Sequence, residues 1–363
     1  MAKIYFTVTN DLNTDQRMIR ICSSLVTAGH EVMLIGRSLS GSHPLENRPY
    51  KQKRIRCLFK KGFLSYAEFN IRLFFFLWFE KRPDLIGAVD LDTILPCLWI
   101  SQWKGCKRIY DAHELFCEMK EIVERPMIYR IWKKIEQYAV PKFKYGYTVN
   151  QQIAEEFKKM YKLDYGVIRS ISLKNDVNPD KPRQRKIIYQ GAVNEGRCFE
   201  QLIPAMKNVN TELHIFGSGN FIEQAVALVE LHELKDKVFF HGIVSPDQLK
   251  KITPEYRIGI TLFEPNAKSN YFSLANRFFD YLHAGVPQLT SDFPVYREMN
   301  NQHEIALMIS DISPVSIANH LNLLLQDDQL WLKLHNNCTS AAAEWNWEKE
   351  SEVLIQFYRN VLA

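Results

Sequence analysis

The sequence predicts an α/β protein of two domains, each built around a doubly wound parallel sheet. The chain has 363 residues, 46% of them hydrophobic, which exceeds the usual size of one hydrophobic core. Short β-branched or aromatic runs alternate with longer amphipathic stretches, as in parallel α/β sheets. The alternation stops once, near the middle of the chain, and then restarts. These observations together indicate two Rossmann-like units of similar size.

In the first half, six short runs rich in β-branched or aromatic residues are predicted as strands. They cover residues 3–8, 31–36, 55–59, 85–89, 108–111 and 145–149. Amphipathic stretches between them predict helices that include 15–28 and 127–138. Strands and helices in this order imply a parallel, doubly wound sheet.

A linker is predicted over 173–185, where hydrophobic periodicity gives way to Pro, Asn and charged residues. The domains are then 1–172 and 186–344, and 345–363 forms a helix with two tryptophans that packs back across the domain junction. Six strands are predicted in the second domain: KIIYQGAV, ELHIFGSG, KVFFHGIV, IGITLF, PQLTSD and IALMIS. Because open α/β sheets bind ligands at their carboxyl edges, the two domains are expected to face a ligand cleft.

Composition excludes several classes of protein. The seven cysteines are scattered, odd in number and without a C-x-x-C pair, which argues against a disulfide framework and a zinc knuckle. The opening residues MAKIYFTVTND run straight into a strand and do not resemble a secretory leader. We therefore expect a cytoplasmic protein. No continuous basic footprint or known module indicates a nucleic-acid partner.

One stretch of the first domain combines basic and aromatic residues. Seven basic residues and no acidic one lie between Arg48 and Lys61, and the apolar segment 63–79 follows. That segment is too short and too interrupted, by Glu68 and Arg72, to span a bilayer. The favoured interpretation is a helix buried against the sheet. The alternative is a surface that contacts anionic lipid on the inner face of a membrane.

The segment SLANRFFDYLHAGVP predicts a helix with an anion site at its start. Ser273 is the expected N-cap, and Gly285 and Pro287 mark the end. A helix N-terminus attracts phosphate, and Arg277 adds charge-assisted bonds. Asp280 lies on nearly the same face as Ser273, at a distance that suits two vicinal ribose hydroxyls.

The same segment resembles the "lPnKlfEYmaaGlPvv" segment of the retaining GT-B glycosyltransferases of family 4. NDLNTDQRMIRICSSLVTAGHEVMLIGR resembles the first βα unit of that family, RIYDAHELF its D-x-H-E-L-F segment, and YTVN the strand end before the domain crossover. IIYQGAVNEGRCFEQLIPAM, LHIFGSG and VFFHGIV follow in family order. The motifs occur in register over nearly the whole chain, which makes the resemblance specific.

The resemblance implies a GT-B fold and transfer of sugar from a UDP- or GDP-sugar to a glycan or lipid-linked acceptor in cell-surface polysaccharide or glycoconjugate synthesis. The C-terminal domain would hold the donor and the N-terminal domain the acceptor, with no metal or other cofactor. The residues with catalytic roles would be His113, Arg197 and Arg277. The donor-binding residues would be Gly191, Arg197, Gly217, Gly219, Ile243, Val244, Ser273, Leu274, Asn276, Arg277 and Asp280. The acceptor side would include Asn10, Asp15, Arg17 and Glu114.

The resemblance also assigns roles within that set. Asp280 would hold the ribose, Arg197 and Arg277 the diphosphate, and His113 the donor sugar. Two positions depart from the family pattern: Phe272 stands where many relatives have a glutamate, and Asp280 replaces the second glutamate. Glu264 and Asn270 lie nearby in the sequence and could substitute for the missing acid.

Other functions stay open from the sequence. A sugar-nucleotide epimerase, a catalytically silent nucleotide-sugar-binding scaffold and a basic peripheral membrane protein are the alternatives. The D-x-D of Asp90 and Asp92 could bind a metal, but it follows a strand in the wrong half for a donor site. The Gly217–Gly219 loop lacks the third glycine of a dinucleotide fingerprint, where Ile222 stands, which disfavours a dehydrogenase.

Overall fold

The computed structural model describes residues 1–39, 41–60, 62–174 and 183–363, and the chain divides into two compact units. Unit 1 comprises Met1–Ser170 and Lys349–Ala363, and unit 2 comprises Ile171–Glu348. The division near residue 170 lies close to the boundary of 172 expected from the sequence. The predicted linker at 173–185 falls largely on 175–182, outside the described residues.

Unit 1 contains a seven-stranded sheet, in which every pair of neighbouring strands is parallel. The strand order is β3-β2-β1-β4-β5-β6-β7. Ile4 of β1, an interior strand, pairs with Val32 on one side and Leu85 on the other. The strands are β1 Lys3–Thr7, β2 Glu31–Arg37, β3 Lys51–Ile55, β4 Leu85–Val89, β5 Lys107–Ala112, β6 Tyr145–Thr148 and β7 Gly166–Val167.

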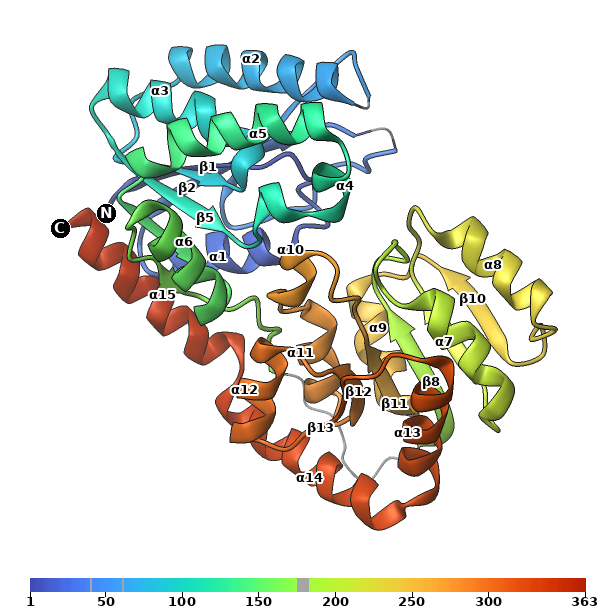
Figure 1. The fold of residues 1–363 in the computed structure, drawn as a ribbon. Helices are drawn as coiled ribbons and strands as arrows, with labels where there is room; N and C mark the ends of the chain where they lie inside the picture. Colours follow the sequence, from blue (N-terminus) through green and yellow to red (C-terminus); the bar gives the residue numbers. More distant parts are fainter. Residues whose placement is uncertain (40, 61, 175–182) are drawn as a thin grey trace. The chain divides into compact units, whose positions relative to one another are not determined.

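Helices cover both faces of this sheet. In Figure 1, α2, α3 and α5 lie on one side, and α1, α6 and the unit 1 part of α15 lie on the other. Asp15 caps α1 by accepting from the amide of Met18, as a helix starting near residue 15 requires. The helices are α1 Gln16–Thr27, α2 Phe63–Phe79, α3 Ile94–Lys104, α4 Lys120–Val123, α5 Pro126–Ala139, α6 Gln151–Tyr161 and α15 Trp347–Leu362, with 3-10 turns η1 Leu91–Thr93, η2 Phe116–Glu118 and η3 Val140–Lys142.

Five of the six strands predicted for the first half are confirmed, and the prediction for 55–59 is wrong. The strand at this place is β3, which ends at Ile55 and lies at the edge of the sheet. Its sequence KQKRI is almost wholly polar, because an edge strand buries little surface. Residues 56–59, which follow it, form no strand hydrogen bonds with β2. Instead the backbone amides of Leu58 and Phe59 donate to the carboxylate of Glu68.

Helix α2 forms where the apolar segment predicted it, but it is not buried against the sheet as expected. Only one stripe of the helix is buried: Ser65, Phe69, Leu73 and Leu77. The side chains on its other faces remain largely in solvent, with Phe79 83% exposed. The hydropathy of the segment is too uniform to show which face would be covered, and α2 therefore carries an exposed aromatic surface.

Unit 2 contains a six-stranded parallel sheet with the order β10-β9-β8-β11-β12-β13, and all six predicted strands are confirmed. A large apolar cluster, which includes Leu202, Val229 and Leu321, packs α7, α8 and α13 on one face of this sheet. The strands are β8 Gln184–Gln190, β9 Leu213–Phe216, β10 Val238–Gly242, β11 Tyr256–Thr261, β12 Gln288–Ser291 and β13 Ala306–Ile309.

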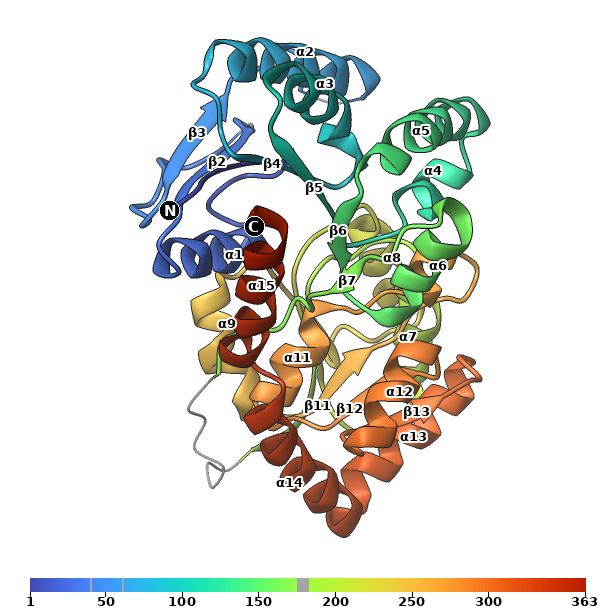
Figure 2. The same cartoon turned by 90° about the vertical axis from the view of Figure 1, so that its left-hand side faces the viewer.

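The opposite face of the unit 2 sheet packs against α9 and α11 through Phe216, Tyr256 and Tyr281. Figure 2 shows α9 and α11 together with the long α14, which leads into α15. The helices of unit 2 are α7 Phe199–Ala205, α8 Ile222–Leu231, α9 Pro246–Ile252, α10 Lys268–Tyr271, α11 Asn276–His283, α12 Pro294–Gln302, α13 Pro314–Gln326 and α14 Asp328–Glu344, with 3-10 turns η4 Met206–Asn208 and η5 Thr253–Glu255.

An internal ion pair ties α1 to the centre of the unit 1 sheet. Arg17 Nη2 lies 2.8 Å and Nε 3.1 Å from the two carboxylate oxygens of Asp111, and Nη1 donates to the carbonyl of Ile168. Both residues of the pair are buried. Arg17, which the resemblance placed on the acceptor side, is thus engaged in the interior of unit 1, where it has a structural role.

We predict that Arg17→Met lowers the free energy of unfolding by about 3–5 kcal/mol, because it leaves the Asp111 carboxylate buried and unpaired. Thermal and urea unfolding measure this loss. The matched control is Arg17→Met combined with Asp111→Leu, which should lose less because no uncompensated charge remains. A single variant as stable as the wild type would contradict the prediction.

Candidate functional site

Each sheet reverses its strand order at one place, and the polar residues predicted from the sequence gather there. The reversal lies between β1 and β4 in unit 1 and between β8 and β11 in unit 2. Parallel α/β sheets bind ligands at such a switch point, beyond the carboxyl ends of the strands. The loops after β8 and β11 begin at Gly191 and Leu262, and those after β1 and β4 at Val8 and Asp90.

In unit 2, the start of α11 differs from the prediction. The helix begins at Asn276, and Ala275 occupies the N-cap position without a side-chain cap. Ser273 is not the N-cap, since its hydroxyl donates to the carbonyl of Asn270. The short α10 ends at Tyr271, and the intervening turn moves the N-cap of α11 by two residues, from Ser273 to Ala275. Gly285 ends the helix as predicted, with a positive φ of 63°.

The hydroxyl of Tyr281 fastens α11 to β8. It donates to the carbonyl of Ile188 and accepts from the amide of Gln190, at 3.2 and 3.0 Å. The ring lies against Gly259, where an added Cβ would come within 2.5 Å of it. These contacts fix the rotation of α11 about its axis, so that the positions of Arg277 and Asp280 are set by the sheet.

Arg277 is a buried guanidinium that still has unused donors. Its side chain packs over the rings of Tyr189 and Phe263, 4.8 and 4.7 Å from the centroids, and Nη1 donates to the Tyr189 hydroxyl. Nε and Nη2 are buried and have no hydrogen-bond partner among the residues that the structure describes. A buried guanidinium in this state is suited to bind an oxyanion.

Arg197 lies beside the same aromatic ring. Its guanidinium carbon is 4.4 Å from the centroid of Phe263, and Nη1 donates to the side-chain oxygen of Asn270 at 2.9 Å. The neighbouring loops meet where the amide of Glu264 donates to the carbonyl of Gly196. The structure thus brings Glu264 and Asn270 together with Arg197, although Phe272 itself packs against Tyr271.

Glycines allow the loops after β8 and β9 to touch through their backbones. A Cβ at Gly217 would lie 1.8 Å from the carbonyl oxygen of Gly191, and one at Gly219 would lie 2.2 Å from the carbonyl oxygen of Val193. A Cβ at Gly191 would approach Arg277 Nη1 to 3.5 Å. The glycines therefore let the backbones of these loops lie close to each other and to Arg277.

Asp280 points toward the end of β8. One carboxylate oxygen accepts from Gln190 Nε2 at 3.0 Å, and the other accepts from the hydroxyl of Ser172. Gln190 is buried and accepts in turn from the hydroxyl of Thr253. Sequence reasoning missed Gln190, because a single glutamine at a strand end carries no local signal for a partner that is 90 residues away.

The remaining donor-side residues differ in exposure. Ile243, in the loop after β10, is 84% exposed, while Val244 packs partly against the cluster of α9 and α11. At the start of α11, Leu274 is buried and Asn276 is exposed. An exposed isoleucine beside the glycine loops is compatible with contact to a planar base.

At the switch point of unit 1, His113 forms an ion pair with Asp90. Its Nε2 lies 2.9 Å from Asp90 Oδ2. Burial lowers the pKa of His113, but the negative charge of Asp90 and the hydrogen bond to it outweigh burial and raise this pKa to about 10. The imidazole is therefore protonated at neutral pH. Its Nδ1 is buried with no acceptor in the described part of the chain.

Asp92 is the second carboxylate at this place. It is buried and accepts from the hydroxyl of Thr9, while its Oδ1 has no partner within the described ranges. Burial and the nearby charge of Asp90 raise the pKa of Asp92 to about 8. Asp90 itself adopts a φ of 56°, which is uncommon for a residue other than glycine.

One of the predicted acceptor-side residues, Asp15, caps a helix, and a second, Asn10, contacts it. Asp15 accepts from the amide of Met18 at the start of α1, and Asn10 Nδ2 donates to its other oxygen at 3.0 Å. Glu114 follows His113 in the loop after β5 and is partly exposed. Of the acceptor-side set, Glu114 is thus the residue next to the Asp90 and His113 pair.

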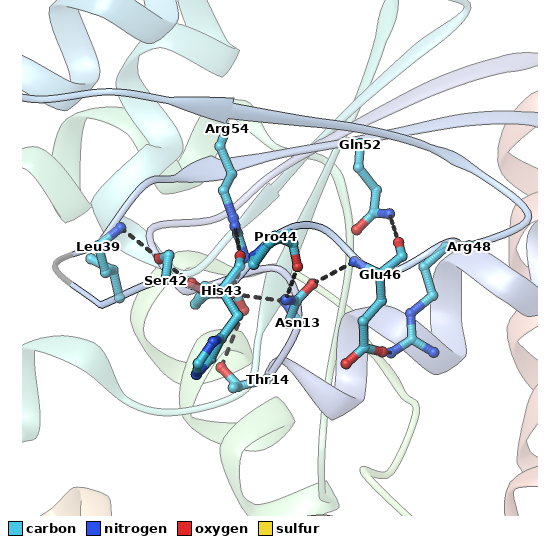
Figure 3. Close-up of polar contacts among 11 residues, drawn as sticks. Asn13, Thr14, Leu39, Ser42, His43, Pro44, Glu46, Arg48, Gln52 and Arg54 are labelled. Carbon is cyan, nitrogen blue, oxygen red and sulfur yellow. Dashed lines mark hydrogen bonds and ion pairs between the residues drawn. The ribbon is translucent and has the colours of Figure 1, made fainter.

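The basic run that begins at Arg48 is partly neutralised. Figure 3 shows the loop after β2 held by polar contacts to the loop after β1 and to β3. Arg54 binds the carboxylate of Asp11 at 2.6 Å, Arg48 pairs with Glu46, and Lys51 Nζ lies 2.7 Å from a Glu31 oxygen. Lys61 lies outside the described residues. This run is therefore a weaker anion-attracting surface than its sequence indicates.

The described residues contain neither a membrane-spanning helix nor a cluster of metal ligands. No helix there has both the length and the apolar character of a membrane span. No group of three or more His, Cys, Asp or Glu side chains is arranged there to hold a metal ion, and this includes the surroundings of Asp90 and Asp92.

One family of known proteins matches about the second half of the chain. Residues 172–345 match the family "Glycosyl transferases group 1". A comparison with curated protein sequences gives no significant match.

Solved structures similar to the whole chain are glycosyltransferases with the GT-B fold. Sucrose-phosphate synthase from Thermosynechococcus elongatus has a TM-score of 0.80 at 16% identity, over 99% of both chains. Anabaena HepE in complex with UDP and glucose has a TM-score of 0.76 at 11% identity, over 98% of this chain and 99% of HepE. A mutant of S. aureus TarM in complex with fondaparinux, α-GlcNAc-glycerol and UDP has a TM-score of 0.75 at 9% identity, over 100% of both chains. These likenesses establish two Rossmann-like domains of the GT-B type.

We predict that Arg277→Lys weakens the binding of pyrophosphate and UDP at least about tenfold. A lysine ammonium keeps the charge but loses the planar fork of donors, and charge-assisted hydrogen bonds contribute about 1.5–3 kcal/mol. Isothermal titration calorimetry measures the affinity. Arg185→Lys is the matched control, because Arg185 is an exposed arginine of the same unit that pairs with Asp328. Unchanged affinity in Arg277→Lys would remove this residue from the site.

We predict that Asp92→Asn stabilises the protein at high pH. A raised pKa means that the folded state holds the Asp92 proton more tightly, so stability is lost as pH rises from about 4 to about 8. The asparagine variant does not titrate, and its amide oxygen still accepts from Thr9. Its advantage should be several kcal/mol at pH 9 and close to zero at pH 4, as measured by thermal unfolding. An advantage that does not change with pH would contradict this assignment.

Proposed function

We propose that the protein is a retaining glycosyltransferase that uses a UDP- or GDP-sugar as donor. The observation that carries the proposal is Arg277, a buried guanidinium at the switch point of unit 2 whose Nε and Nη2 have no hydrogen-bond partner among the described residues. The family match of residues 172–345 and the UDP bound in the similar structures of HepE and TarM support a nucleotide-sugar donor.

In this proposal, cleavage of the glycosyl phosphate bond transfers negative charge to the departing diphosphate. Arg277, Arg197 and the N-terminal end of α11 stabilise that charge more in the transition state than in the bound donor. Loss of one such donor typically costs about 3 kcal/mol in the barrier. These groups supply the positive charge, so the proposal includes no metal.

The nucleoside half of the donor is assigned to the other side chains of unit 2. Asp280 accepts hydrogen bonds from the two ribose hydroxyls, and Gln190 holds its carboxylate in place. Gly191 lies beside the phosphates, Gly217 and Gly219 let the neighbouring loop pack against the loop that carries it, and Ile243 and Val244 flank the base. In unit 1, the protonated His113 donates a hydrogen bond to the donor sugar.

The acceptor is a glycan or a lipid-linked molecule of the kind used for cell-surface polysaccharides or glycoconjugates. We also propose a cytoplasmic location with peripheral contact to an anionic membrane. The support is the exposed aromatic surface of α2 and α3, which includes Phe75, Phe79 and Trp103. Tryptophan and phenylalanine with nearby basic residues are typical of surfaces that rest in the lipid headgroup region.

We predict that Asp280→Asn weakens UDP and GDP binding by about tenfold or more, because a neutral amide is a poorer acceptor for two hydroxyls. Calorimetry measures the affinity, and release of UDP from UDP-sugars measures turnover. The matched control is Asp328→Asn, since Asp328 is an exposed carboxylate of unit 2 remote in sequence from α11. Unchanged affinity in Asp280→Asn would overturn the proposed donor site. Tight binding without transfer or hydrolysis would indicate a silent scaffold.

A further inference from the structure

An apolar groove lies in unit 1 between α2, α3 and α5. Its volume is about 430 Å³, within the range of about 300–1,000 Å³ that is typical of ligand pockets. Its walls include Ala67 and Ile71 from α2, Trp99 from α3, and Ile131 and Trp132 from α5. The size and the concave shape distinguish it from a flat hydrophobic patch.

The groove is almost free of polar groups that need water. Its polar members are Asn70, the hydroxyl-bearing Tyr66 and Asp92. The Asn70 amide donates to the carbonyls of Tyr66 and Asp92, at 2.9 and 2.8 Å, which satisfies it within the protein. With a pKa of about 8, Asp92 is mostly uncharged at neutral pH. An occupant therefore need not supply charge.

The walls of the groove are formed by apolar side chains that are exposed to solvent. Phe63, Ile71 and Phe75 of α2 are 60%, 58% and 54% exposed, and Trp99 of α3 is 43% exposed. Covering apolar surface gains about 25 cal/mol per Å². An apolar molecule that fills the groove would cover these side chains and would thus be bound by the hydrophobic effect.

Asp92 connects this groove to the polar groups at the switch point. It lines the groove, and it also receives the Thr9 hydroxyl and lies near the Asp90 and His113 pair. Asp92 Oδ1 has no hydrogen-bond partner among the described residues. It can therefore accept a hydrogen bond from an occupant of the groove, or donate one when the carboxyl group is protonated. One end of the groove is therefore polar, and the rest is apolar.

We propose that the groove binds the hydrocarbon chain of a lipid acceptor, whose hydroxyl head group lies at Asp92. This inference rests on the proposed function. Of the two acceptors considered there, a glycan and a lipid-linked molecule, it selects the lipid-linked one. A chain followed by a hydroxyl matches an apolar groove with one carboxyl group at its end. A protein partner would need about 800 Å² of surface on each side, which is far more than a single groove supplies.

The test uses n-alkyl β-glucosides from hexyl to decyl, below their critical micelle concentrations, with methyl glucoside as the control without a chain. Calorimetry on the whole protein should show affinity that rises by about fourfold per methylene group, since each buried methylene contributes about 0.8 kcal/mol. No dependence on chain length would overturn the proposal.

Two pairs of variants locate the chain. Ala67→Trp fills the groove and should abolish the dependence on chain length, while Leu64→Trp, on the same helix but outside the groove, should keep it. Ile131→Glu places a charge on the opposite wall, and Met127→Glu is its control on α5. UDP affinity, which depends on unit 2, should be unchanged in all four variants, and thermal unfolding close to that of the wild type shows that unit 1 of each variant is folded.

The outcomes separate this proposal from the proposed function. If Ala67→Trp and Leu64→Trp reduce binding of the alkyl chain equally, the groove is not the binding site and the whole exposed face contacts the membrane instead. If the protein is a dimer and both variants disrupt it, the face binds a second copy of this protein. If transfer to a soluble acceptor is as fast as to its alkyl derivative, the lipid acceptor is wrong and the transferase stands. If Asp280→Asn leaves UDP affinity unchanged but chain binding follows the predictions, the donor site is wrong and the groove stands.

Discussion

The candidate donor site depends on the hydroxyl of Tyr281. By bonding to the carbonyl of Ile188 and the amide of Gln190, it fixes α11 against the end of β8. Only glycine at position 259 leaves space for the ring. With the helix held in this rotation, Arg277 reaches the aromatic rings of Tyr189 and Phe263, and Asp280 reaches Gln190. A helix of eight residues could not hold two charged side chains in place by itself.

The two units use one topology for different electrostatic purposes. In unit 2, guanidinium groups of Arg197 and Arg277 pack over aromatic rings at the switch point, where an anion is favoured. In unit 1, the corresponding place holds Asp90, Asp92 and His113: burial and the charge of Asp90 raise the pKa of Asp92, and the same charge outweighs burial and raises the pKa of His113. The same strand order therefore supports an anion site in one unit and a proton-holding cluster in the other.

The sequence predicted those features that depend on local pattern. All six strands of unit 2, the helix over 15–28 and the Gly285 stop of α11 were predictable, because propensity and turn chemistry act over a few residues. The edge strand β3 was not, since its polar sequence carries no hydrophobic alternation. The displaced start of α11, the engagement of Arg17 with Asp111, and the role of Gln190 depend on partners distant in the chain. The sequence also could not show that only one stripe of α2 is buried, because this depends on which other helices pack against it.

The backbone contact between Gly191 and Gly217 has a mechanical consequence. Because no side chain separates the two loops, neither can shift toward the other, and a displacement of one presses directly on the other. A phosphate that orders the loop after β8 would therefore also rigidify the loop after β9. Both loops would lose conformational entropy when the phosphate binds. Recognition of the two halves of a bound nucleotide would in this way be cooperative without any moving domain.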